Sequence, residues 1–131
     1  MPDRLPGLPP GRLPDRSSLG RNAELQAVKY LEKQGYKIVC RNYRTRQAEI
    51  DIIARDGAWL VFIEVKARSS GRFGGPAEAV DLKKQEKIAR AAQVYMSASK
   101  TEFLPARFDV VTIGPGGLEH IKDAFESLDN R

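Results

Sequence analysis

The chain has 131 residues, which is enough for one domain and too short for two of ordinary size. Its single cysteine and single histidine, Cys40 and His120, exclude an internal disulfide framework and a Cys/His zinc site, and we expect both to be structural residues without partners. No apolar run approaches the roughly 18–20 residues needed to span a bilayer. The first residues have no apolar core of the signal-peptide type, so we expect a cytoplasmic protein with no membrane partner.

The net charge of +5 is unevenly distributed along the chain. Residues 1–47 contain ten Lys and Arg against four Asp and Glu, whereas residues 48–131 contain twelve against thirteen. A basic surface beside a group of carboxylates suits a phosphate backbone together with a metal ion. A basic, soluble surface without a partner is the alternative that charge alone leaves open.

The elements can be predicted in chain order. Five of the eight prolines lie in the first fourteen residues, so residues 1–17 are predicted to be a disordered tail and residues 18–131 a single domain. A helix capped by Ser17 or Ser18 should run to about Gln34 and stop at Gly35.

Five strands are predicted from β-rich runs: residues 36–40, 49–54, 59–66, 107–113 and 118–125. The second and third strands are joined across Asp56-Gly57, which is a strong hairpin signal. A Gly-rich loop over residues 69–76 precedes a second helix over residues 81–98. The order α-β-β-β-α-β-β predicts an α/β fold, a mixed β-sheet flanked by helices.

Charged residues interrupt the apolar pattern of the two central strands. The strand over residues 59–66 begins apolar on both faces, as a central strand should, but Glu64 and Lys66 then replace aliphatic residues on one face. Glu49 and Asp51 do the same in the preceding strand. Burial of charge is costly unless the charge is paired or bound to a metal, so these residues are candidates for a functional site.

The hairpin turn decides how Asp51 and Glu64 are related. A two-residue loop at Asp56-Gly57 would make them diagonal neighbours on one face, a four-residue loop would place them directly opposite, and a three-residue loop would separate them. Two carboxylates on one face can share a hard cation such as Mg²⁺. Lys66 on the same face could orient a water or stabilise charge on a phosphate, a combination that metal-assisted phosphodiester hydrolysis needs.

Asp51 followed by Glu64-Val65-Lys66 resembles the PD-(D/E)xK nuclease signature. Five segments resemble more closely the YraN family of bacterial proteins, which is related to archaeal Holliday-junction resolvases: GRNAE at 20–24, RNYR at 41–44, AEIDII at 48–53, VFIEVK at 61–66 and RFDVV at 107–111. Ala48 departs from the Gly that is usual in that family, which affects only the expected local backbone conformation.

The resemblance implies a restriction-endonuclease-like fold. It further implies that Asp51 and Glu64 hold Mg²⁺ or Mn²⁺, that Lys66 is the catalytic lysine, and that Glu24 is the acidic residue that related resolvases bring to the catalytic site from the first helix. DNA, including branched DNA, is the implied partner. Resolvase-like folds often dimerise to cut two strands, so a homodimer is a further expectation from the resemblance.

Several basic and aromatic residues are candidates for binding the nucleic-acid backbone: Arg41, Tyr43, Arg44, Arg46, Arg68 and Arg72. The arginines would clamp phosphates and the tyrosine would stack on a base. A solvated basic strand edge is an equally weighted alternative for the first four. Arg68 and Arg72 belong to the Gly-rich loop region, which could close over a nucleic-acid strand.

Other charged residues near these motifs have more modest expected roles. Glu49 is expected to form a salt bridge with Arg46 or Lys66 rather than to bind metal, and Lys84 or Gln85 could reach the site from the second helix. The leading hypothesis is a resolvase-like, metal-dependent deoxyribonuclease. The alternatives are a non-catalytic nucleic-acid-binding module with a relic acidic pocket and a protein-binding scaffold without salt-dependent DNA affinity.

Overall fold

The computed structural model describes residues 18–68 and 80–126. The expected proline-rich tail, the Gly-rich loop and Arg72 lie outside the described residues. Within these described residues, two helices and five strands follow one another in the predicted order: α1 (Ser18–Lys33), β1 (Lys37–Arg44), β2 (Glu49–Asp56), β3 (Trp59–Ala67), α2 (Leu82–Ser99), β4 (Ala106–Gly114) and β5 (Gly117–Phe125).

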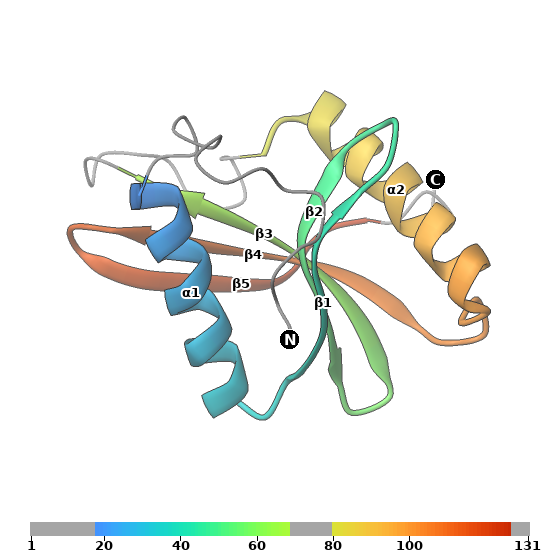
Figure 1. The fold of residues 1–131 in the computed structure, drawn as a ribbon, viewed down its shortest axis with the longest axis horizontal. Helices are drawn as coiled ribbons and strands as arrows, with labels where there is room; N and C mark the ends of the chain where they lie inside the picture. The colour runs from blue at the N-terminus through green and yellow to red at the C-terminus, as the bar shows by residue number, and fades with distance from the viewer. Residues whose placement is uncertain (1–17, 69–79, 127–131) are drawn as a thin grey trace.

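The strands form one open sheet in the order β1-β2-β3-β4-β5 (Figure 1). Strands β3 and β4 are parallel, with α2 in the connection between them, and the other neighbouring strands are antiparallel. The α/β fold with a mixed sheet is therefore confirmed. Among the described residues, the helices are too short or too polar to cross a membrane.

The two helices cover opposite faces of the sheet (Figure 1). The buried cluster on the α1 face includes Ala27, Leu31, Ile52, Val61, Ile63 and Val111. The buried cluster on the α2 face includes Ile53, Phe62, Ile88, Ala92, Phe108 and Val110. Strand β3 contributes alternate residues to both clusters, as a strand apolar on both faces should, so it is the central strand that its sequence predicts.

The helix ends follow from local sequence signals. Gly35 ends α1 with a φ of +94°, and the next N–H, that of Tyr36, donates to the carbonyl of Leu31. Asp81 caps α2, because its side chain accepts a 2.8 Å hydrogen bond from the backbone N–H of Lys84. Both boundaries agree with the prediction to within a residue or two.

Strand β1 is longer than predicted, because it continues to Arg44 and takes up much of the basic stretch. The pairing with β2 shifts between Ile38 and Cys40, and Asn42 adopts a φ of 54°. Asparagine tolerates this left-handed conformation better than most residues. The side chain of Asn42 donates to acidic residues on both α1 and β2.

The turn between β2 and β3 differs from the prediction. Asp56 pairs with Trp59, so Gly57 and Ala58 form the two-residue turn, and Gly57 supplies the positive φ of 62°. The register is therefore not the one that gives a diagonal arrangement but the one expected for the directly opposite arrangement, and both place Asp51 and Glu64 on one face. The observed register, continued by one residue beyond Ile52 and Ile63, sets Asp51 directly across from Glu64.

Strands β2 and β3 diverge at the end that carries these carboxylates. Their pairing runs from the turn to Ile52 and Ile63, whereas β2 stays paired with β1 as far as Glu49. Figure 1 shows the β1–β2 hairpin turning toward α2 while β3 and β4 continue in another direction. The sheet therefore forks at Asp51.

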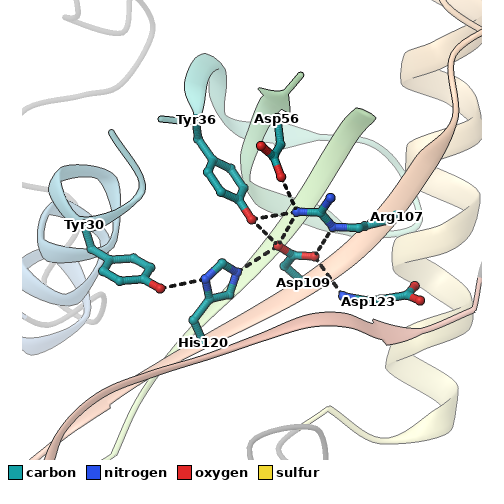
Figure 2. A network of polar contacts seen from close by, with 7 residues as sticks. All are labelled: Tyr30, Tyr36, Asp56, Arg107, Asp109, His120 and Asp123. Atoms are coloured by element: carbon teal, nitrogen blue, oxygen red, sulfur yellow. Dashed lines mark hydrogen bonds and ion pairs between the residues drawn. The ribbon is translucent and has the colours of Figure 1, made fainter. Parts of the chain in front are cut away.

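A polar network on the α1 face ties distant parts of the chain together (Figure 2). Its centre is Asp109, whose side chain is 0% exposed and accepts hydrogen bonds from Tyr36 (3.1 Å), Arg107 (3.0 Å) and the backbone N–H of Asp123 (3.0 Å). His120 lies 2.8 Å from Asp109 through Nε2 and 2.9 Å from the hydroxyl of Tyr30 through Nδ1.

His120 is therefore a structural residue, as expected, but the expectation that it lacks partners was wrong. Arg107 extends the network to Asp56, 3.0 Å away at the turn end of β2. The network thus links α1, β2, β4 and β5 through hydrogen bonds and ion pairs that centre on the buried Asp109. Removal of one member of such a network leaves other polar groups buried without partners, which is costly.

The network should make stability sensitive to acid. Burial by itself would raise the pKa of Asp109, but hydrogen bonds from His120 and Arg107 outweigh burial and hold the pKa below its ordinary value. A carboxyl with a lowered folded-state pKa stabilises the fold above its unfolded pKa of about 3.9, and this contribution is lost as the pH falls through the folded value. We expect urea unfolding at decreasing pH to show this loss in the wild type and a smaller acid dependence in Asp109→Asn. Equal acid dependence in both proteins would contradict the assignment.

Candidate functional site

An open cleft of about 560 Å³ lies where the sheet forks, on the face covered by α2. Strands β2 and β3 and the first turns of α2 contribute its walls. The charged residues that line it include Asp51, Glu64, Lys66, Lys83, Lys84 and Lys87. The cleft therefore brings together the two carboxylates and the lysine that the sequence singled out, and it adds three lysines from α2.

Asp51 sits at the point of the fork. Its Oδ2 accepts a 2.8 Å hydrogen bond from the backbone N–H of Val65 on β3. The carboxylate thus takes a backbone donor at the place where the β2–β3 pairing has ended, and this bond fixes the side chain between the two strands. A carboxylate held in this way is a preorganised ligand or base.

Glu64 is the deepest carboxylate of the cleft, with 6% of the residue exposed. Its Oε2 lies 2.8 Å from Nζ of Lys84, which reaches in from α2. Burial and the negative charge of Glu64 raise the pKa of Asp51 well above its ordinary range. The two carboxylates are therefore close enough for the charge of Glu64 to disfavour ionisation of Asp51, and a cation bound between them would relieve the repulsion.

Lys66 lines the same cleft two residues beyond Glu64 on β3. Side chains two residues apart in a strand share a face, and the buried Phe62 shows that this is the α2 face. Lys66 is partly buried and lines the cleft from the same face as Glu64. This is the relation to the carboxylates that the sequence predicted.

Glu24 enters from α1 and is 5% exposed, but it does not line the cleft itself. Nδ2 of Asn42 donates to Glu24 Oε2 (3.1 Å) and to Glu49 Oε2 (3.0 Å), so the amide bridges the two carboxylates. Glu24 and Glu49 are near enough to Asp51 for their charges to raise its pKa further, after burial and Glu64. The acidic group therefore extends from the cleft through Asn42 to α1.

Glu49 lines the cleft, and its ion-pair partner differs from the expected one. Its Oε1 lies 3.4 Å from NH2 of Arg44, rather than pairing with Arg46 or Lys66. The pairing follows from the register, because Arg44 is directly opposite Glu49 across the β1–β2 ladder. Since Arg44 is mostly exposed, this pair contributes little to stability.

The aromatic and basic side chains of β1 have different surroundings. Arg41 approaches Glu24 at 3.6 Å, and Arg46 is exposed in the β1–β2 turn. The ring of Tyr43 packs edge-on against Tyr95 of α2, with centroids 5.2 Å apart. Tyr43 is thus engaged with the core, and the exposed arginines of this edge are the side chains that a phosphate backbone could reach.

Arg68 lies away from the lining of the cleft. Its side chain is 10% exposed, lies 3.8 Å from Glu119 of β5, and packs closely against Gly114. A Cβ at Gly114 would lie 3.2 Å from the Arg68 side chain, so glycine keeps this space open. The packing leaves little of the guanidinium available to a phosphate.

Three contributors to this region were missed by sequence reasoning. Lys83 and Lys87 line the cleft, although only Lys84 or Gln85 was expected to reach it from this helix. The available signal was their place in the first turns of a helix that follows the strand with Glu64 and Lys66. Asn42 was missed as well, and its signal was an Asn inside a strand-like run, where that residue is rare. Gln85 is turned away and donates to the carbonyl of Val80 (2.9 Å).

The donor set of the cleft fits one kind of ligand. Carboxylate oxygens are the ligands that hard divalent cations prefer, and Mg²⁺ uses one or two of them and keeps several waters. Across residues 18–68 and 80–126, no three Asp, Glu, His or Cys side chains are grouped closely enough to bind one metal ion together. A cation that takes Asp51, Glu64 and waters fits this arrangement, whereas a fully protein-ligated site does not.

Comparison with known proteins places these motifs in a family. The model of the uncharacterised protein family UPF0102 matches residues 23–113, from α1 into β4. A UPF0102 protein of Thermodesulfovibrio yellowstonii is 47% identical over 110 residues, which cover 84% of this chain and 97% of that protein. A UPF0102 protein of Geobacter metallireducens is 48% identical over 113 residues (83% and 93%), and one of Hahella chejuensis is 45% identical over 121 residues (90% and 98%).

Proposed function

The chain belongs to the family UPF0102, the YraN family, and from the chemistry of its cleft we propose that it is a Mg²⁺- or Mn²⁺-dependent nuclease that hydrolyses phosphodiester bonds in DNA. One observation carries the proposal most directly. Asp51 and Glu64 come together at the fork of the sheet, in an open cleft with lysines on its rim. A buried carboxylate pair is costly to maintain, and a use in metal binding accounts for it.

In this proposal Asp51 and Glu64 hold the divalent cation. When bound, the cation would supply Lewis-acid stabilisation of the phosphate and a water of lowered pKa. Asp51 is suited to the task because the N–H of Val65 fixes one of its oxygens and leaves the other for a ligand. Glu64 is suited because its position in the central strand allows little movement.

Lys66 would orient the attacking water and stabilise negative charge that develops on the phosphate. Its support is its place on the cleft side of β3, two residues from Glu64. Glu24 would complete the acidic group indirectly, because it fixes Asn42 and through it Glu49. The exposed Arg41, Arg44 and Arg46 of the β1 edge would contact the DNA backbone outside the cleft.

A second candidate function is a non-catalytic DNA-binding module. The Lys84–Glu64 ion pair favours it, because it neutralises one cleft carboxylate without any metal. The two functions differ in their response to chelators. A binding module should bind DNA equally well with and without divalent cations, whereas the nuclease should need them for hydrolysis.

The metal site can be tested by calorimetric titration of Mn²⁺. We expect the wild type to bind Mn²⁺ and Asp51→Asn to lose that binding, since one of two ligating carboxylates is removed. Asn at this position can still accept the hydrogen bond from Val65, so the fork should be preserved.

Asp81→Asn is the matched control for this titration. Asp81 lines the same cleft, and Asn is an equally good N-cap, so the variant removes a nearby charge without removing a proposed ligand. It should bind Mn²⁺ nearly as the wild type does. If the wild type takes up no Mn²⁺ with or without a DNA junction, the nuclease proposal fails and the non-catalytic module becomes the better account.

A further inference from the structure

The ion pair between Lys84 and Glu64 joins a fixed side chain to a movable one. Glu64 belongs to the central strand and its side chain is 6% exposed, whereas the side chain of Lys84 is 44% exposed at the rim of the cleft. A lysine carries its charge on a flexible four-carbon stem and can change partner without a change in the backbone. The backbone of Lys84 is itself anchored, because its N–H donates to the cap residue Asp81.

The charges of the cleft make this pair sensitive to a second cation. Lysine is ordinarily charged near neutral pH, and Nζ of Lys84 lies 2.8 Å from Oε2 of Glu64. In the free protein Lys84 therefore neutralises the charge of Glu64. A divalent cation bound to both carboxylates would neutralise them. The cation would also repel the ammonium group of Lys84 from its position beside Glu64.

The lysines around Lys84 would attract a phosphate, and that phosphate could become the new partner of Lys84. Lys83 and Lys87 line the same cleft from the same helix, and Lys66 lines it from β3. Lysines from two elements therefore face one open space of about 560 Å³ above the carboxylates. A phosphate of a nucleic-acid strand lying in the cleft would be near several of these ammonium groups.

We propose that Lys84 is an exchangeable countercharge: it neutralises Glu64 in the free protein and transfers to a backbone phosphate of the bound nucleic acid when a divalent cation occupies Asp51 and Glu64. This inference rests on the proposed function. It makes Lys84 a positioning residue that couples metal binding to DNA binding. The coupling is positive, because the cation releases a lysine that the DNA then uses, and DNA must favour the cation by the same factor.

The test compares Lys84→Met with Lys87→Met, both in a Lys66→Met background that keeps the DNA intact. The two substitutions remove the same charge from the same wall of the cleft, but Lys84 is the one that is paired with a cleft carboxylate. Three affinities are measured for each protein: that for Mn²⁺ by calorimetry without DNA, and those for a labelled DNA duplex by anisotropy in Mn²⁺ and in chelator. Circular dichroism checks that each protein is folded.

Lys84→Met should bind Mn²⁺ about threefold tighter, because the competing cation is gone, and should bind DNA about threefold more weakly in Mn²⁺. Its DNA affinity in chelator should be nearly unchanged, since Lys84 is held by Glu64 under that condition. Lys87→Met should instead weaken DNA binding equally in Mn²⁺ and in chelator. Opposite shifts in metal and DNA affinity are not expected from a residue that only supports the fold.

Two results would overturn the exchange while leaving the proposed function intact. One is the same pattern of affinities for Lys84→Met and Lys87→Met. The other is a loss of DNA affinity in Lys84→Met that is equal with and without Mn²⁺. Failure of the Lys66→Met protein without further substitutions to bind Mn²⁺ would be a different outcome, because it would overturn the metal site itself.

Discussion

Replacement of Lys66 by methionine should lower the rate of DNA hydrolysis by about 10²–10⁴-fold, the usual range for loss of a group that assists proton transfer. Methionine is nearly as long as lysine and can fill the same partly buried space without the ammonium group. Mn²⁺ affinity should be retained or slightly raised, because Asp51 and Glu64 are untouched. The substitution therefore separates the chemical step from metal binding.

The assay needs a set of DNA substrates, because the structure of the preferred substrate is not fixed by the cleft. Labelled single strands, duplexes, flaps and four-way junctions would be incubated with Mg²⁺ or Mn²⁺ and resolved on denaturing gels. Lys87→Met is the matched control, since it removes a lysine from the opposite wall and should lower the rate only through weaker DNA binding. Hydrolysis by Lys66→Met at the wild-type rate would remove this lysine from the mechanism.

The second large effect is expected from Asp109→Asn, which should lower the free energy of unfolding by about 3–5 kcal/mol. Asp109 accepts hydrogen bonds from a tyrosine, an arginine and a backbone N–H and lies beside His120 (Figure 2). An amide removes the negative charge opposite Arg107 and directs two N–H donors toward groups that are themselves donors. The loss should be measured from urea unfolding at neutral pH.

Asp123→Asn is the matched control for this stability prediction. Asp123 is exposed, and its backbone N–H is the group that donates to Asp109. Its φ of 56° is also tolerated by asparagine. The control should change the free energy of unfolding by no more than about 0.5 kcal/mol. Similar effects of the two substitutions would mean that the hydrogen bonds to the buried carboxylate of Asp109 do not stabilise the fold as inferred.

The two predictions concern opposite faces of one sheet. Lys66 shares the α2 face with Phe62 and Val110, whereas Asp109 shares the α1 face with Val111. Asp109 is nevertheless paired with Ile63, next to Glu64, in the β3–β4 register. The buried network on one face therefore fixes the strand that presents the candidate site on the other. Stability measurements on site variants should accordingly accompany activity measurements.

Local sequence patterns were sufficient for the elements and for much of the core. Apolar residues at helical spacing predicted α1, and Gly35 marked its end, because these signals depend only on neighbouring residues. The strand over residues 59–66 could be identified as central, since only a strand covered on both faces is apolar on both. The order of elements followed, and with it the mixed sheet.

Other features depended on contacts that are remote in sequence. The partner of Glu49 is set by the β1–β2 register, which shifts between Ile38 and Cys40. The partners of His120 come from α1 and β4. No local pattern specifies such contacts, because they arise only when distant segments pack together.

By itself the sequence determined that charged residues interrupt a buried central strand, and hence that Asp51, Glu64 and Lys66 deserved to be considered together. Only the tertiary structure decided how they meet: the turn at Gly57-Ala58 sets the register, and the fork of β2 from β3 opens the cleft. The tertiary structure also brought Lys84 onto Glu64. The physical reason is that alternation along a strand is a local property, whereas strand divergence and helix docking are set by packing across the whole sheet.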